Sequence, residues 1–160
     1  TFLQMGLANG VQPLLGYNYG AGNMARFRQV ERFTKKCCLV VGVLATALYF
    51  VLREPIIRIF IDDDQVVAYG VQMLIAYMVS GPVIGILFVN MNCMQSVGHA
   101  LGATVLSILR QGVLLIPLLY LLEAFLGLNG IIFGQSVTDY IAVILSVGMW
   151  ARVRKTVKIP

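Results

Sequence analysis

The chain has few charged residues, few acidic side chains and few cysteines, and each shortage excludes a class of protein. Only 12% of its 160 residues are charged, about half the share of an average soluble domain. That share is too low for the surface of an ordinary cytosolic enzyme, and the high apolar content excludes a disordered chain. Three cysteines do not make a disulfide-stapled secreted scaffold. The net charge of +5 comes from basic residues clustered beside apolar runs, so no nucleic-acid partner is expected.

Long apolar runs fill most of the chain. Apolar residues make up 59% of it, and the mean hydropathy is +0.84. A bilayer core of about 30 Å needs about 20 helical residues to cross it. We therefore expect an all-α, polytopic helical membrane protein with about five transmembrane helices. The predicted spans are residues 1–19, 34–52, 66–94, 101–122 and 130–151.

The distribution of Lys and Arg predicts which side of the membrane each connection faces. Residues 20–36 contain five basic residues, and the tail after residue 151 contains four. Residues 53–65 contain two, together with four acids. Because basic residues concentrate in cytoplasmic connections, we expect 20–36 and the C-terminus to be cytoplasmic. The polar, glycine-rich patch 95–102, QSVGHALG, is the predicted turn between the third and fourth spans.

The first residues, TFLQMG, lie inside an uncharged predicted helix. They carry no basic flank and no cleavage site, so they do not form a signal peptide. The charge pattern directs this helix from the outside inward, yet no upstream segment brings the chain outside. We expect the chain to be the C-terminal part of a longer, transporter-like protein.

Several motifs occur in an order typical of one transporter family. Residues 10–23, GVQPLLGYNYGAGN, followed by Arg26, resemble the end of the eighth helix of MATE (multidrug and toxic compound extrusion) transporters. Residues 53–60, REPIIRIF, are similar to the external segment after the ninth helix. Later motifs resemble the eleventh and twelfth helices: Arg110-Gln111-Gly112, Ile116-Pro117-Leu118, and residues 127–130 with Gln135, Thr138 and Asp139.

The resemblance implies a fold and an activity. MATE proteins have two six-helix lobes and export cationic, amphipathic compounds, such as drugs, in exchange for H⁺ or Na⁺, without a cofactor. This chain would be a partial C-terminal lobe embedded in membrane lipid. It would lack helix seven and the N-terminal lobe, its partner from the same protein. The sodium-coupled branch has an acid in helix ten, but the corresponding span 66–94 contains none. That difference argues against the sodium site that this branch has in its C-terminal lobe, and it makes the chain more similar to members that couple through the half that is missing here.

Arg110 and Asp139 are the only charged residues inside their predicted spans. Counting residues from the span ends places them at depths that differ by about 4–5 Å, on helices joined by a short connection. A charge at mid-bilayer costs several kcal/mol unless it is paired or hydrated. One interpretation is that Asp139 binds the coupling ion, or that the pair gates a polar cavity. The alternative is a structural ion pair between two helices.

Uncharged polar side chains in the spans also allow two interpretations. Gln111 follows Arg110, and Gln135 lies one helical turn before Asp139 on the same face. Both are candidates for lining a cavity, or for hydrogen bonds between helices. For Asn92 and Gln95, late in the third span, the structural role is favoured.

Gly81 and Pro82 form the strongest helix break in the sequence. Proline removes one backbone hydrogen bond and kinks a helix, and such a kink can be the hinge of a transporter. Static kinks are also common in membrane helices. We predict a hinge at Gly81 and Pro82, with a static kink as the alternative.

No nucleophile with a neighbouring base and no phosphate-binding loop is visible in the sequence, so we expect a protein that is not an enzyme. The acidic run 62–64 lacks the spacing of a metal-binding loop, and no metal site is predicted. The predicted function is part of a multidrug efflux antiporter, in the plasma (inner) membrane of a bacterium. Two alternatives stay open: a flippase for lipid-linked saccharides from the same superfamily, or a non-transporting fragment or membrane-enzyme subunit.

Overall fold

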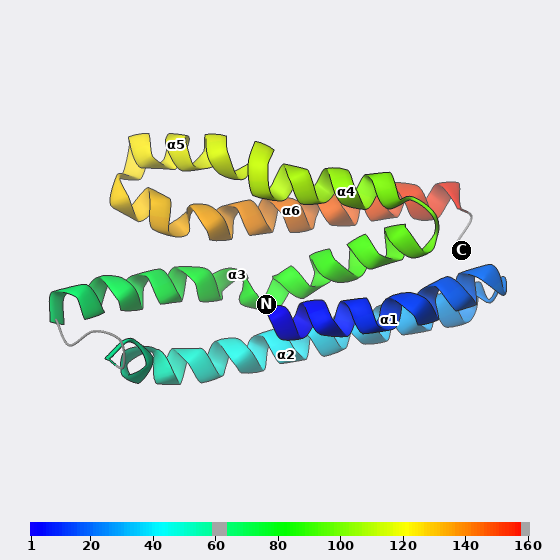
Figure 1. Ribbon diagram of the computed structural model, residues 1–160, viewed down its shortest axis with the longest axis horizontal. Helices are drawn as coiled ribbons and strands as arrows, with labels where there is room; N and C mark the ends of the chain where they lie inside the picture. The colour runs from blue at the N-terminus through cyan, green and yellow to red at the C-terminus, as the bar shows by residue number, and fades with distance from the viewer. Residues whose placement is uncertain (59–63, 158–160) are drawn as a thin grey trace.

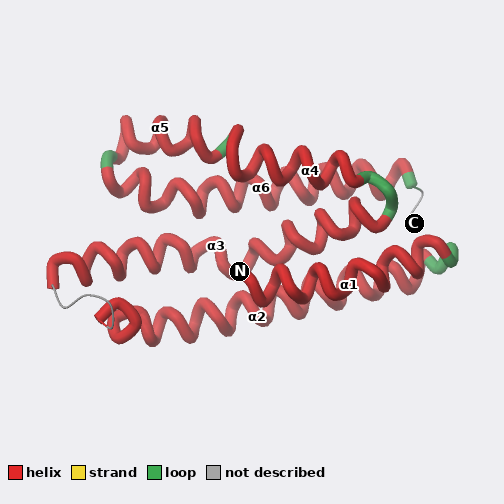
Figure 2. The backbone as a smooth tube through the Cα atoms, in the orientation of Figure 1, coloured by secondary structure: helices red, strands yellow, loops and turns green. Residues whose placement is uncertain are grey.

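The computed structural model describes residues 1–58 and 64–157, and helices account for nearly all of them (Figures 1 and 2). The described part contains no strand, which confirms the all-α prediction. One short π-helical segment, η1, interrupts a long helix between α4 and α5. The elements are α1 (Phe2–Gly20), α2 (Met24–Arg58), α3 (Asp64–Ser96), α4 (Ala100–Ile108), η1 (Leu109–Val113), α5 (Leu115–Leu126) and α6 (Leu128–Thr156).

Four helical segments are long and apolar enough to cross a membrane, which fits a polytopic membrane protein. The first predicted span, 1–19, does form a helix, α1, but it is not one of the four. Polar residues along α1 lower its hydropathy, and two of them, Gln4 and Asn18, are buried against the rest of the chain. The four segments are Met24–Arg53, Gly70–Ser96, Ala100–Leu126 and Gly130–Thr156.

The predicted connections 20–36 and 53–65 are shorter than expected. Helix α2 runs without interruption from Met24 to Arg58, so the five basic residues of 20–36 lie on its first turns. The prediction was wrong here because long basic side chains can reach water while the backbone stays helical. The turn predicted within 95–102 is confirmed, because α3 ends at Ser96 and Gly98 has a φ of 85°. Asp62 and Asp63 lie outside the described residues.

Helix α3 lies at the centre of the molecule and packs against α1, α2, α4 and α6. Figure 1 shows α1 and α2 along one side of α3, and the α4–α5 arm with α6 along the other. The same view shows α3 bent near its middle, where Gly81 and Pro82 occur. The beginning of α2 and the end of α6, which carry the two basic clusters, lie at the same end of the molecule. That arrangement agrees with the charge pattern of the sequence.

Helices α2 and α3 approach each other closely at two glycines. A Cβ atom at Gly42 would lie 2.8 Å from the Pro82 Cα atom and 2.8 Å from the Gly81 carbonyl oxygen. A Cβ atom at Gly85 would lie 2.6 Å from the Cys38 Cβ atom. Small residues allow such approaches between membrane helices, where van der Waals packing drives association. The position of the α3 bend therefore depends on the absence of side chains at these two glycines.

We predict that Gly42→Ala destabilises the protein by about 1–3 kcal/mol, because the added methyl group meets the α3 backbone. Thermal unfolding of the detergent-solubilised protein measures this change. Gly148→Ala in α6 is the matched control, because nothing lies within 4 Å of its Cβ position. The control should keep or raise the unfolding temperature, since alanine favours helix. Equal unfolding temperatures for the two variants would contradict the close packing.

Candidate functional site

A buried carboxylate at the centre of the molecule binds side chains from three helical segments. Asp139 of α6 is only 4% exposed. Its Oδ1 atom accepts hydrogen bonds from Arg110 Nε at 2.9 Å and from Gln135 Nε2 at 3.2 Å. Its Oδ2 atom accepts one from Ser80 Oγ of α3 at 2.9 Å. The structure thus brings together the predicted residues Arg110, Gln135 and Asp139, and adds Ser80, which the sequence reasoning missed.

The backbone that holds Arg110 is π-helical over Leu109–Val113. The Leu114 N–H group donates to the Leu109 carbonyl at 2.7 Å, five residues earlier. Pro117 provides a local cause, because its ring cannot tolerate a regular helical carbonyl at position 113, the last residue of the π segment. π-Helical turns occur frequently at functional sites. The sequence signal for this distortion was Pro117, four residues after the segment that it disturbs.

The ion pair is well enclosed by protein. The side chains of Arg110 and Asp139 are 15% and 6% exposed, respectively. The Arg110 guanidinium also lies 5.8 Å from the centroid of the Phe88 ring, within the range of a cation–π contact. Three hydrogen bonds and this contact compensate for removing two charges from water. The geometry satisfies both interpretations of the pair: a tie between helices, and a polar site adjoining a cavity.

A cavity of about 420 Å³ adjoins Arg110. It lies between α1, α3 and the α4–η1 segment, and it combines two phenylalanine rings and two methionines with amide and hydroxyl groups. Gln111 lies in its wall, whereas Gln135 binds the Asp139 carboxylate. The cavity is lined by Thr1, Phe2, Met5, Asn9, Phe88, Met91, Asn92, Gln95, Ser107, Arg110 and Gln111.

The asparagines late in α3 point to two different neighbours. Asn90 is fully buried, and its Nδ2 atom donates to Ser146 Oγ of α6 at 3.0 Å. Asn92 faces the other way and donates to Asn9 Oδ1 of α1 at 3.0 Å. Gln95 accepts from Gln12 of α1 at 3.0 Å, one turn further along. Asn92 and Gln95 thus form hydrogen bonds between helices and also line the cavity.

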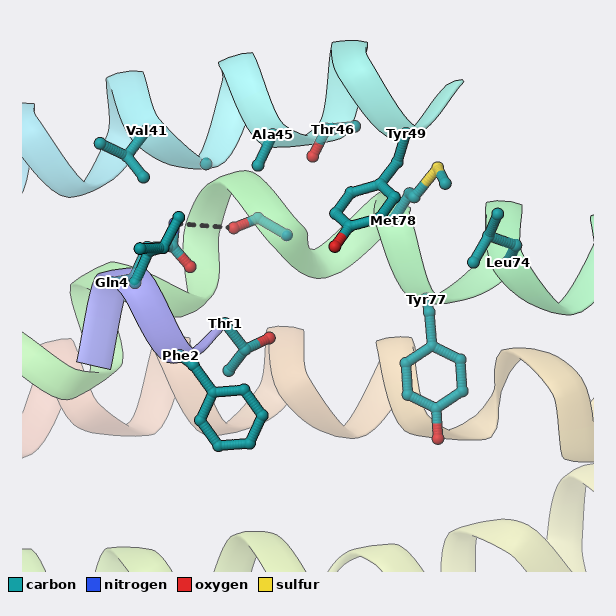
Figure 3. Close-up of a pocket in the computed structure, with 13 residues that line it drawn as sticks. Thr1, Phe2, Gln4, Val41, Ala45, Thr46, Tyr49, Leu74, Tyr77 and Met78 are labelled. Carbon is teal, nitrogen blue, oxygen red and sulfur yellow. Dashed lines mark hydrogen bonds between the residues drawn. The ribbon is translucent and has the colours of Figure 1, made fainter. Parts of the chain in front are cut away.

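The bend of α3 is held by side chains from both of its flanks. Figure 3 shows Gln4 of α1 directed at the bend, where its Nε2 atom donates to the Gly81 carbonyl at 3.0 Å. Figure 3 also shows Tyr49 and Tyr77 in the wall of a second cavity, of about 330 Å³, beside this bond. From α6, Tyr140 donates to the Val79 carbonyl at 2.8 Å, and Ser136 donates to the Ala76 carbonyl. Polar side chains of neighbouring helices therefore bind the backbone on both sides of the Asp139–Ser80 contact.

A second buried carboxylate lies at the end of the molecule that carries the basic clusters. Glu31 of α2 is 4% exposed and accepts hydrogen bonds from Trp150 Nε1 at 2.7 Å and Lys35 Nζ at 2.6 Å. The sequence reasoning missed it, because it placed residues 20–36, and with them Glu31, in a connection between spans. A signal was present in the sequence. Phe27, Glu31, Thr34 and Cys38, all buried, follow the spacing of one helical face across the predicted boundary.

Comparison with known proteins identifies the family. Residues 1–121 match the family model MatE. The chain belongs to the MATE family. The multidrug export protein MepA of Staphylococcus saprophyticus is 31% identical over 137 residues, which cover 86% of this chain and 30% of that protein. The sequence-based identification of the family is thus confirmed.

Solved MATE structures have the same fold. The Vibrio cholerae MATE transporter VcmN in its bent form superposes with a TM-score of 0.83 at 21% identity, over 93% of this chain and 34% of that one. The inward-facing form of a multidrug resistance MATE family transporter gives 0.88 at 17% identity, over 94% and 36%. The chain spans about a third of the length of these proteins. MATE proteins are membrane transporters, not enzymes, and need no cofactor, as expected from the sequence.

We predict that Asp139→Leu destabilises this MATE chain by about 3–5 kcal/mol, because Arg110 is left buried without its acid. Arg110→Met combined with Asp139→Leu should restore most of that loss, since no uncompensated charge remains. Denaturation in detergent measures both changes, and Glu123→Leu, at an exposed acid of α5, is the control. A double variant as unstable as the single one would show that the pairing is not what stabilises the site.

Proposed function

We propose that this chain is part of a secondary multidrug exporter that exchanges cationic, amphipathic compounds for H⁺ or Na⁺. It acts in the plasma membrane of a bacterium, joined to the N-terminal lobe of the same protein, with its C-terminus in the cytoplasm. The MepA relatives, named as multidrug export proteins, support the substrate class. The basic clusters at one end of the fold support the orientation. Alternating access needs two halves around a central site, so this chain alone should not transport.

The observation that carries the exchange mechanism is the dual position of Arg110. Its Nε atom binds the Asp139 carboxylate, and its side chain also lines the 420 Å³ cavity. While Asp139 is ionised, the pair is neutral and a cationic compound can occupy the cavity. When a proton or Na⁺ binds Asp139, the Arg110 charge is no longer compensated, and it repels the cation. Ion binding and drug binding then exclude each other, as exchange requires.

The size of this repulsion is sufficient for exchange. Two like charges about 6 Å apart, in surroundings with an effective dielectric constant of about 20, repel each other by about 3 kcal/mol. That energy corresponds to a difference of about 100-fold in affinity between the two states of Asp139. The same arrangement disfavours the flippase alternative. Among the described residues that line the cavity, Arg110 is the one basic side chain, and because Asp139 neutralises it, it offers little to a phosphate group.

The bend at Gly81 and Pro82 connects this charge change to movement. Ser80, two residues before Pro82, donates to Asp139 Oδ2. Protonation of Oδ2, or its coordination by Na⁺, weakens Oδ2 as the acceptor of the Ser80 hydrogen bond. The bend is also held by hydrogen bonds from Gln4, which is buried, and from Tyr140, which is exposed. We propose that Gly81 and Pro82 form a hinge whose angle changes when Asp139 binds its ion.

We predict that Asp139→Asn in the complete transporter lowers the affinity for tetraphenylphosphonium, a cationic probe, by about 100-fold and abolishes ion-driven uptake. The asparagine is neutral at every pH, so Arg110 stays uncompensated. Equilibrium binding by the purified protein measures the affinity. Uptake into inside-out vesicles, driven by a pH gradient or by a sodium gradient, measures the exchange and identifies the ion.

Two further variants make this experiment decisive. Arg110→Gln combined with Asp139→Asn should regain probe binding without regaining ion-driven uptake, because the repelling charge is gone but the ion site is absent. Glu123→Gln replaces an exposed acid of α5 and should leave both unchanged. Normal uptake by Asp139→Asn with an unchanged pH profile would refute the coupling role, and the pair would then be a structural tie.

We predict that Pro82→Ala slows export by about tenfold or more without changing probe affinity, because a straightened α3 resists the change between states. Initial rates of probe uptake, separated from equilibrium binding, measure the two effects. Pro13→Ala in α1 is the matched control and should keep the rate near that of the parent. Equal rates for the parent and both variants would make the α3 bend a static kink.

A further inference from the structure

One face of α2 carries a row of basic side chains. Arg28, Arg32 and Lys36 follow each other at intervals of four residues, so they lie along the same side of the helix. Together with Ala25, Gln29 and Phe33 they border a groove of about 480 Å³ on the helix surface. The row spans about 12 Å along the helix axis. We call these three residues the basic row.

The acid of this segment, Glu31, and the neighbouring Lys35 face elsewhere. Glu31 is buried and binds Trp150 of α6, and Lys35 forms an ion pair with Glu31 at 2.6 Å. In the part of the chain that the structure describes, no acidic side chain forms an ion pair with the basic row. The three charges of the row are therefore directed outward without a protein counter-charge from the described residues.

The basic row continues directly into an exposed apolar face. Four and seven residues after Lys36, on the same side of the helix, come Val40 and Val43, which are 57% and 49% exposed. The adjoining Phe33 is 68% exposed. One side of α2 thus changes from positive to aliphatic at Lys36. An anionic phospholipid has the same sequence of chemistry along its length: a negative headgroup followed by acyl chains.

We propose that the basic row of α2 is a binding site for the headgroup of an anionic phospholipid, whose acyl chains lie along Val40 and Val43. The headgroup phosphate binds between Arg32 and Lys36, at the boundary between charge and aliphatic surface. Arg guanidinium groups suit phosphate oxygens, because they offer two parallel N–H donors. Basic residues beside a membrane helix attract anionic lipid in this way. The site is independent of the exchange mechanism, since Asp139 and the cavity take no part in it.

The test is photocrosslinking from position 33 of the complete transporter. Phe33 is replaced by p-benzoylphenylalanine, and the protein is reconstituted in vesicles with equal amounts of phosphatidylglycerol and phosphatidylcholine. Illumination followed by mass spectrometry counts the adducts of each lipid. We expect phosphatidylglycerol adducts to exceed phosphatidylcholine adducts by about fivefold or more, the effect of at least one basic side chain on an anionic lipid.

Two triple variants, which lose the same amount of positive charge, distinguish a lipid site on the basic row from a general attraction between anionic lipid and basic residues. Changing Arg28, Arg32 and Lys36 to Gln should bring the adduct ratio close to one. Changing Arg152, Arg154 and Lys155, the basic residues at the end of α6, to Gln should leave the ratio as it is in the parent. The proposal fails if the parent ratio is near one, or if both triple variants lower it equally. It also fails if the probe captures protein instead of lipid, since a protein then covers this face.

Discussion

The buried ion pair between Arg110 and Asp139 is the interaction on which the centre of this fold depends. A charge placed in the membrane costs several kcal/mol, so each of these residues requires the other. The requirement fixes how η1 and α6 face each other and, through Ser80, where α3 lies between them. The three helical segments that meet at one carboxylate are also those that border the cavity or the bend. Stability and exchange thus depend on the same contacts.

The long helix α3 packs closely against α2, but hydrogen bonds from other helices hold the backbone at its bend. On one side, Gly42 and Gly85 allow α2 to approach its backbone. On the other, hydroxyl groups of α6 bind its carbonyls beside Pro82. Side-chain hydrogen bonds between membrane helices contribute only about 0.6 kcal/mol each, so they can exchange partners at little cost. The hinge proposed at Gly81 and Pro82 therefore requires the exchange of individually weak bonds on this side of α3, while the close approach of α2 stays in place.

The sequence predicted the features that follow from composition and spacing. Apolar runs located the long helices, and depth counting brought Arg110 near Asp139. The sequence did not predict that Ser80 binds Asp139, because no motif or spacing distinguishes a serine that lies two residues before a proline. The start of α2 was also misplaced. Five basic residues indicate that the side chains reach water, but they do not show that the backbone stops being helical. Glu31 was missed for the same reason, although Phe27, Thr34 and Cys38 extend its buried face.

The few charged side chains of this chain fall into two groups: those buried among other helices and those that face outward. Asp139 and Glu31 are almost fully buried, and each is bound by a cation and by one or more neutral donors. The cations of α2 that face outward have lipid as their available counter-charge. A helix such as α2 therefore presents different chemistry on its two faces at the same depth: Glu31 joins it to α6, and Arg32 beside it is exposed. The inward contacts hold the helices together as a unit, and the outward charges fix the depth of that unit in the membrane. In the exchange mechanism that we propose, movement at the α3 bend requires that depth to be maintained, because a lobe that sank or rose as it moved would no longer align the Arg110 cavity with the N-terminal lobe.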